Sequence, residues 1–315
     1  MSTTSTPATI TPTSRFVWLV KREFWEYRGS FMWAPAITAM VMLALFVMAL
    51  VSAEIFGQQH GLNMSGIRID ELSKHLDAAD YDKAHAGIDF GLLTMGFPIG
   101  IALFFVTFFY CLGALYNDRA DRSVLFWKSL PISDRTTVLA KASIPLVVVP
   151  LLTFAIGVTT HFIMLLVSSA ILLGSGASVA ALWRSISFFR MSLLLLYHIF
   201  TAHTLWPAPI YCWMLLVSAW ARRAPFLWAV LPPVAIAGLE GIAFHTSHFA
   251  AALAGRFIGS ASTSASTGPD IFPTNPMTHI TPVEYLASPG LWFGLLVAGA
   301  FLAAAVCVRH YREPL

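Results

Sequence analysis

The sequence is short of charge. Aspartate, glutamate, lysine and arginine together make up 11% of its 315 residues, whereas about 25% is usual for a soluble domain. So few charges do not cover the surface of a soluble protein of this size. The shortage excludes a soluble globular protein and a nucleic-acid-binding protein. The 57% of hydrophobic residues excludes a disordered chain.

Cysteine is also scarce. The chain contains Cys111, Cys212 and Cys307, each within an apolar stretch. An odd number of cysteines does not form a closed set of disulfides within one chain, and none of the three has a partner at the spacing of a metal site. We expect all three to be small, buried hydrophobic residues.

Long apolar runs, in contrast, are abundant. A membrane-spanning helix needs about 20 mostly apolar residues. Six stretches meet this requirement, at about 31–51, 91–115, 144–173, 191–219, 226–244 and 290–308. The sequence therefore predicts an all-α, polytopic membrane protein with a six-span domain over residues 31–308. Pro207 and Pro209 lie in the fourth stretch and Pro232 and Pro233 in the fifth, where freed carbonyls must be satisfied by neighbouring helices or water.

Lysine and arginine orient these spans. With the amino terminus inside, 13 of the 19 basic residues fall on the inside of the membrane and six on the outside. This bias predicts that both termini are cytoplasmic. The segments 52–90 and 245–289 are then outside, and the first of these is acidic. The loop 116–142 and the tail 309–315 are inside.

The amino-terminal 30 residues consist of a polar tail and a predicted helix. Residues 1–13 are rich in serine, threonine and proline, and we expect a disordered tail rather than a signal peptide. Residues 14–30 are expected to form a helix that Ser14 caps and Gly29 ends. Its apolar face carries Phe16, Leu19 and Phe24, with Glu23 inside the stripe. This pattern favours a helix lying in the inner headgroup layer.

The inside loop 116–142 has an ordered series of signals. A charged exit from the bilayer is followed by a short apolar and aromatic turn of helix at 124–130, which Pro131 ends. Ser133 is then a good N-cap for a helix that runs through Lys141. We expect a compact helical protrusion, rich in aromatic and basic residues, just inside the membrane. Such a protrusion suits docking to a partner better than catalysis.

Two segments carry a resemblance to a family. They are LVKREFWEYR at 19–28 and FWKSLPIS at 126–133. With them the chain resembles the permease subunits of ABC transporters of the type-two export class. The resemblance implies an elbow helix containing Lys21, Arg22, Phe24 and Trp25. It also implies a coupling helix that inserts into a cleft on a separate ATPase subunit, formed by Phe126, Trp127, Lys128, Ser129, Leu130, Pro131, Ile132 and Ser133.

The resemblance also implies a function. The chain would be a transport subunit in the cytoplasmic membrane of a bacterium, working as a homodimer. It would export, or give immunity to, a peptide, antibiotic, lipid or similar amphiphile. The sequence has no G-x-x-x-x-G-K-[ST] phosphate loop, so ATP and Mg would be bound by the partner ATPase. We therefore expect a chain that is not an enzyme and has no catalytic residue, metal site or cofactor of its own.

Other interpretations rest on polar residues within the spans. Glu240 lies in an apolar run between Gly238 and Gly241, and an intramembrane carboxylate often faces a cavity or partner. It is a candidate for the transport path, or for a proton site in a proton-coupled secondary transporter. His161, His198 and His203 also fall in predicted spans and leave open a haem- or metal-dependent intramembrane redox subunit.

Overall fold

The computed structural model describes residues 12–59, 98–123, 132–174, 179–185, 188–258 and 282–311, and in these residues every regular element is a helix. Five of the described helices are long and apolar enough to cross a membrane. They are Arg28–Ser52, Pro98–Ala120, Asp134–Gly174, Pro225–Phe244 and Pro289–Tyr311. The structure is therefore all-α, and its long apolar helices are those of a multi-pass membrane protein. Most of the two predicted outside segments, and both chain ends, lie outside the described residues.

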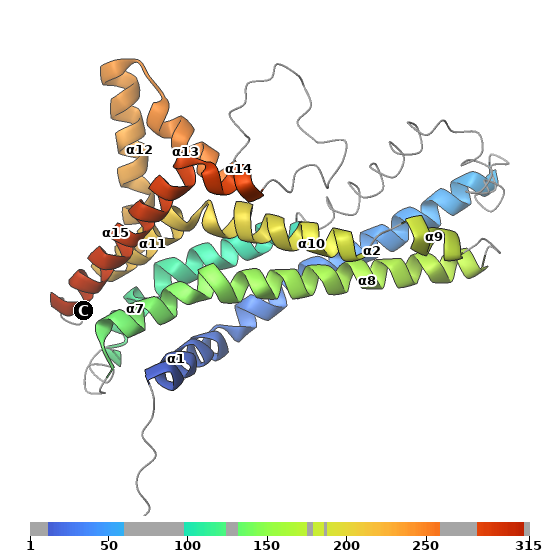
Figure 1. The fold of residues 1–315 in the computed structure, drawn as a ribbon, viewed down its shortest axis with the longest axis horizontal. Coiled ribbons are helices and arrows are strands. Elements are labelled where there is room, and N and C mark those ends of the chain that lie inside the picture. The colour runs from blue at the N-terminus through green and yellow to red at the C-terminus, as the bar shows by residue number, and fades with distance from the viewer. Residues whose placement is uncertain are drawn as a thin grey trace, which may run out of the picture.

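The chain begins with two helices joined at a bend (Figure 1). They are α1, Pro12–Glu26, and α2, Arg28–Gln59. The prediction that Gly29 ends the first helix was wrong, because the break comes at Tyr27 and α2 runs through Gly29. The Tyr27 ring meets the Tyr110 ring edge to face, with centroids 5.0 Å apart. This aromatic contact fixes the place of the bend.

The next two passes meet at the loop that contains residues 124–131. The helix that starts at residue 98 loosens at Ala114 and Leu115 and continues as α5, Tyr116–Ala120. After the loop come α7, Asp134–Ser143, the π-helix η1, Ile144–Val148, and α8, Val149–Gly174. The Ser133 hydroxyl accepts a hydrogen bond of 3.2 Å from the Thr136 amide. The predicted N-cap and the helix through Lys141 are confirmed.

The fourth predicted span, 191–219, is broken. It consists of α10, Phe188–His198, the π-helix η2, Ile199–Leu205, and α11, Ala208–Trp220, and α9, Val179–Ser185, precedes it. The chain bends at Trp206 and Pro207 because proline has no amide hydrogen to continue the helix. Figure 1 shows α10 beside α8 and α11 turning away towards α15. This break is why the described residues contain five uninterrupted spans rather than the six predicted.

The last third of the chain forms the other side of the molecule. It contains α12, Pro225–Phe244, α13, His248–Ile258, α14, Pro282–Ala287, and α15, Pro289–Tyr311. The helix α15 packs along α11 more extensively than any other described pair of elements. The helix α12 stands out from the bundle (Figure 1). Most of the α12 side chains are exposed, which suits a helix that contacts lipid or another chain.

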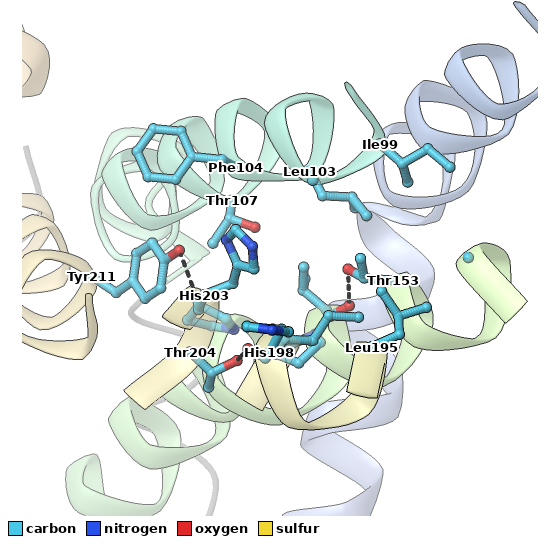
Figure 2. Close-up of a pocket in the computed structure, with 16 residues that line it drawn as sticks. Ile99, Leu103, Phe104, Thr107, Thr153, Leu195, His198, His203, Thr204 and Tyr211 are labelled. Carbon is cyan, nitrogen blue, oxygen red and sulfur yellow. Dashed lines mark hydrogen bonds between the residues drawn. The ribbon is translucent and has the colours of Figure 1, made fainter. Parts of the chain in front are cut away.

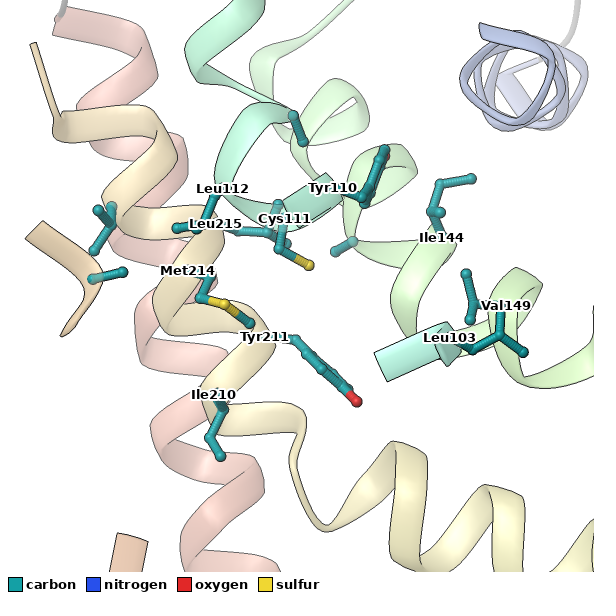
Figure 3. Close-up of a cluster of buried hydrophobic side chains, with 14 of the residues drawn as sticks. Leu103, Tyr110, Cys111, Leu112, Ile144, Val149, Ile210, Tyr211, Met214 and Leu215 are labelled. Atoms are coloured by element: carbon teal, nitrogen blue, oxygen red, sulfur yellow. The ribbon is translucent and has the colours of Figure 1, made fainter. Parts of the chain in front are cut away.

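The main core lies where α2, the helix from residue 98, η1 and α11 meet. Figure 3 shows Tyr110, Cys111 and Leu112 facing Ile144 from η1 and Met214 from α11. Cys111 and Cys212 are buried as predicted. Cys307 is exposed on α15, so the same prediction was wrong for Cys307.

We predict that Tyr211→Phe weakens the bend between η2 and α11. The Tyr211 hydroxyl donates to the His203 carbonyl at 3.1 Å, and Pro207 supplies no amide to that carbonyl. Losing this buried hydrogen bond costs about 1 kcal/mol, to be measured as a lower free energy of unfolding in detergent micelles. Tyr311→Phe, at an exposed position, is the control. Equal stabilities of the Tyr211 variant and the control would contradict the assignment.

Candidate functional site: a buried charge network and an intramembrane cavity

Four charged side chains from four helical segments are buried together at one end of the bundle. They are Glu23 of α1, Asp118 of α5, Lys141 of α7 and Arg309 of α15. The Lys141 Nζ lies 2.9 Å from Glu23 Oε1 and 3.3 Å from Asp118 Oδ2. The Arg309 Nη1 lies 3.3 Å from the same Asp118 oxygen. Because each isolated buried charge costs several kcal/mol, these four groups constrain one another's positions.

Neighbouring polar groups extend the charge network, defined here as Glu23, Asp118, Lys141 and Arg309. The Arg309 Nε lies 3.1 Å from Asp134 Oδ1, and His310 Nδ1 lies 3.4 Å from Asp134 Oδ2. The Tyr110 hydroxyl lies 3.3 Å from both Glu23 Oε2 and the Lys141 carbonyl oxygen. That carbonyl is the one that Pro145, which lacks an amide hydrogen, leaves without its usual helical donor.

The charge network explains why Glu23 interrupts the apolar face of the first helix. Leu19 and Glu23 lie one turn apart on α1, and both are buried. Leu19 packs against Ala140 with Phe16, Val20 and Ile132 around it. The face therefore docks on α7 through an apolar patch and a buried ion pair. The helical pattern marked Glu23 as an exception to the apolar stripe, but its partners Lys141 and Asp118 are too distant in sequence for any local pattern to pair them.

A second polar contact joins the end of α5 to the end of α11. The Arg119 Nη2 donates to the carbonyl oxygens of Ser218, at 2.9 Å, and Ala221, at 2.6 Å. The Ser218 hydroxyl accepts from the amides of Leu115 and Tyr116, both at 2.9 Å. The Ser218 hydroxyl is therefore the acceptor for two amides of the loosened turn before α5. Arg119 caps the carboxyl end of α11.

The predicted elbow residues lie on different sides of α1. Phe24 is half-buried and its ring stacks on Phe31 at 6.3 Å between centroids, whereas Lys21 and Trp25 are exposed. The Arg22 Nη2 lies 3.1 Å from Glu26 Oε2. Partial burial, followed by the nearby charge of Glu23, raises the pKa of the Glu26 carboxyl. The exposed polar face of α1 is thus separate from the face that carries Glu23.

The predicted coupling residues are only partly placed. Phe126, Trp127, Lys128, Ser129, Leu130 and Pro131 lie outside the described residues. Ile132 packs against the Leu19 patch, and Ser133 caps α7. The structure therefore fixes the two ends of the segment 124–131 while the segment itself is not described. The end before it is α5, held through Asp118 and Arg119, and the end after it is α7, held through Lys141.

A cavity of about 220 Å³ lies within the bundle. Its walls come from the helix that starts at residue 98, from η1 and α8, from α10 and η2, and from Tyr211 of α11 (Figure 2). Both π-helices thus border the same cavity. Single π-turns within longer helices occur frequently at functional sites. The proline residues that accompany these turns, Pro145, Pro150 and Pro207, remove amide donors on both sides of the cavity.

The polar side chains that line the cavity belong to histidine, threonine and tyrosine residues. Figure 2 shows the rings of His198 and His203 directed into the space, with the Thr107 hydroxyl beside the His203 ring. The hydroxyls of Thr153 and Thr204 donate to Val149 and Ile199 carbonyls at 2.8 and 2.9 Å. The residues that line the cavity include no aspartate, glutamate, lysine or arginine. Across the described residues, no group of three or more histidine, cysteine, aspartate or glutamate side chains is placed to hold a metal ion.

The carboxylate of Glu240 caps α13. Its Oε1 accepts from the Thr246 hydroxyl at 2.9 Å and the His248 amide at 2.8 Å, and its Oε2 accepts from the Phe249 amide at 2.8 Å. The amides at the start of a helix have no partners within the helix, so a carboxylate there stabilises the turn. The structure thus gives Glu240 a capping contact, and a place in a transport path stays a prediction.

Arg256 fastens α13 to the bend and to the start of α15. Its guanidinium lies 4.2 Å from the centre of the Trp206 ring and donates to the carbonyls of Trp206 and Gly290. The Trp206 Nε1 donates in return to the Gly255 carbonyl at 2.7 Å. Gly294 leaves room for the guanidinium, because a Cβ at that position would lie 2.6 Å from Arg256 Nη1 and would displace it. Burial raises the pKa of nearby Tyr285 to about 12, so its hydroxyl stays protonated and donates to the Thr201 carbonyl.

Comparison of the chain with protein-family models, with curated proteins and with solved structures finds no match.

We predict that Lys141→Met destabilises the protein by about 3–5 kcal/mol, because it leaves the carboxylates of Glu23 and Asp118 buried without their shared cation. The measurement is the free energy of unfolding in detergent micelles. Adding Glu23→Gln to Lys141→Met should restore part of the loss, since the two side chains interact directly.

The control for this variant is Arg22→Met, which removes a partly exposed cation from the same end of the bundle and should cost about 1 kcal/mol or less. Strictly additive effects of Lys141→Met and Glu23→Gln would show that the buried pair contributes nothing.

We predict that Glu240→Ala makes the backbone amides of His248 and Phe249 exchange with deuterium several-fold faster, because both lose their acceptor. Hydrogen exchange with mass spectrometry over residues 245–258 measures the change. Glu240→Gln keeps an acceptor oxygen and should show a smaller increase. Wild-type exchange in Glu240→Ala would rule out the cap.

Proposed function

We propose that this chain is the permease subunit of an ATP-driven exporter of the ABC type-two export class. It lies in the bacterial cytoplasmic membrane with both termini inside, forms a homodimer and binds separate ATPase subunits. The proposal starts from the resemblance of the segments 19–28 and 126–133 to the elbow and coupling helices of that class. The observation that carries it further is the charge network, which holds both ends of the segment 124–131 to the bundle.

The charge network supports a mechanical role for that segment. A force applied at 126–133 reaches α5 and α7 within a few residues. Asp118 and Lys141 pass it to α1 through Glu23 and to α15 through Arg309. Because separating any of these helices would leave a buried charge unpaired, the helices are expected to move together. A coupling helix needs this property, whereas an ordinary connecting loop does not.

The contacts also support six crossings. The helix α10 begins beside the middle of α8, where the Phe162 and Phe188 rings are 5.9 Å apart. The helix α11 ends at Arg119, next to the charge network. The broken segment 188–220 thus runs from the middle of α8 to the end of the bundle that carries the charge network, although neither part of it is long enough to span alone. Counting it with the five uninterrupted spans gives six, with α1 and the end of α15 on the same side.

The proposed mechanism follows from these contacts. ATP and Mg bind to the partner ATPase subunits, whose closure displaces the coupling residues 126–133. The displacement reaches η1 directly, because η1 continues α7 without a loop. The π-helices η1 and η2 touch, so movement of α7 alters the walls of the cavity. Rocking of packed helices of this kind is a common way to convert partner closure into a change at a distant site.

The alternative functions find less support in the geometry. The two oxygens of Glu240 already accept three hydrogen bonds, which favours a cap over a proton site. His198 and His203 do face one cavity, but a haem macrocycle is larger than about 220 Å³. A Soret band in the purified protein, or transport driven by a proton gradient without nucleotide, would replace the proposal with one of these alternatives.

We predict that replacing Trp127 and Leu130 together with glutamate abolishes binding of the ATPase subunit, because two charges then occupy the apolar surface that enters the ATPase cleft. The measurement is co-purification of the ATPase from native membranes, together with its stimulated ATP hydrolysis. We expect at least a tenfold loss of bound ATPase.

The matched control is Leu139→Glu. Leu139 is exposed on α7 at the same end of the bundle, outside the proposed coupling residues. It should leave ATPase binding near the wild-type level. If the Trp127 and Leu130 double variant retains normal binding and hydrolysis, the docking role is wrong.

A further inference from the structure

We infer that the cavity between the two π-helices is a binding site for a small uncharged amphiphile, which has an apolar body and one hydrogen-bonding group. This inference deepens the proposed function, because it names the substrate class of an exporter and places its site within one chain. It stands on the volume of the cavity, on the side chains that line it and on the backbone of its walls.

The volume sets the size of the ligand. An apolar protein cavity of about 150 Å³ holds benzene, and pockets for drug-sized molecules begin at about 300 Å³. The cavity here, at about 220 Å³, lies between the two. A peptide or a complete lipid does not fit within it. A ligand with a single ring and a short polar substituent does.

The lining sets the chemistry of the ligand. Apolar side chains, among them Leu103, Phe104 and Leu195, make up much of the lining, which suits an apolar body. His203 presents an imidazole on the cavity side and keeps exposed surface there. A neutral imidazole offers one donor and one acceptor, so it matches a hydroxyl, an amide or a neutral amine. The lining carries no charged side chain to pair with an ion, and an unpaired charge is expensive within a membrane protein.

The backbone of the cavity walls suggests how a bound ligand is released. Pro145 and Pro150 on one side, and Pro207 on the other, lack the amide that an α-helix uses as a donor, and two of the affected carbonyls are contacted by tyrosine hydroxyls. The Tyr110 hydroxyl donates a hydrogen bond to the Lys141 carbonyl, and the Tyr211 hydroxyl donates one to the His203 carbonyl. Prolines and π-turns are the places where helices bend, so bending of these walls would change the shape of the cavity. Tyr110 also contacts Glu23, and it lies on the same helix as the lining residues Leu103 and Thr107, so this helix connects the charge network to the wall of the site.

The test is photolabelling of the purified full-length chain in lipid nanodiscs, without the ATPase. The probe is 4-(3-trifluoromethyl-diazirin-3-yl)benzyl alcohol, an uncharged aryl alcohol that forms a covalent adduct on illumination. We expect labelling that saturates with probe concentration and maps by mass spectrometry to residues 99–107, 149–157 and 195–204. Benzyl alcohol should compete, whereas benzoate and benzylammonium should not.

Two threonines on α8 give a matched pair of variants. Thr153 lines the cavity and Thr159 is exposed, and each hydroxyl donates to the carbonyl four residues earlier. Thr153→Phe fills the cavity and should reduce saturable labelling at least tenfold. Thr159→Phe adds the same bulk to the outer face of the same helix and should leave it unchanged.

A third variant tests the polar contact and covers the case in which Thr153→Phe does not fold. His203→Leu should weaken competition by benzyl alcohol roughly three- to tenfold, which corresponds to one hydrogen bond. Competition by toluene, which lacks the hydroxyl, should not weaken.

The inference is overturned if labelling rises linearly with probe and falls on the lipid-facing sides of α2 and α12. Equal labelling of folded Thr153→Phe and wild type, equal competition by the charged analogues, or an unchanged benzyl alcohol effect in His203→Leu would also overturn it. Because the ATPase is absent from this experiment, a negative result leaves the proposed coupling intact. If ATPase binding and stimulated hydrolysis are not found but the cavity is labelled as expected, the proposed exporter function is rejected and the binding site is retained.

Discussion

The fold depends most on the pairing of buried charges at the end where α1, α5, α7 and α15 meet. Glu23, Asp118, Lys141 and Arg309 are each nearly inaccessible, and each is tolerable there only with its partners in place. Replacing such a cluster with apolar residues is often neutral or stabilising, so stability alone does not account for it. We interpret the charge network as a joint that holds four helical segments in one arrangement around the ends of the segment 124–131.

The second constraint is the loss of backbone donors at the prolines. Pro145 and Pro207 each lack the amide that would donate to the carbonyl four residues earlier, and a tyrosine hydroxyl from another helix contacts that carbonyl in each case. Tyr110 therefore connects two passes, and Tyr211 ties together the two parts of the broken fourth span. The cavity lies between these points. A rigid joint at one end and adaptable walls in the middle form an arrangement that suits movement driven from outside the membrane.

The sequence predicted the features that depend on local pattern. The apolar runs placed the long helices, Ser133 was identified as a cap from its position before α7, and the helix through Lys141 followed. The sequence did not predict the break at Tyr27, because that bend depends on the ring of Tyr110. It also did not pair Glu23 with Lys141, or bring His198 and His203 to one cavity with Thr107. These relations join distant residues, and the π-turns that shape the cavity have no simple periodic signal.

The most direct test of the central claim is whether α1 and α15 keep a fixed separation that depends on the charge network. Cys307 is exposed on α15 whereas Cys111 and Cys212 are buried, so a spin label at Cys307 and another at Val17→Cys report the distance by double electron–electron resonance. The account predicts one narrow distance distribution, which broadens when Lys141→Met is introduced and stays narrow with Arg22→Met. A distribution that is broad from the start, or that Lys141→Met leaves unchanged, would contradict it.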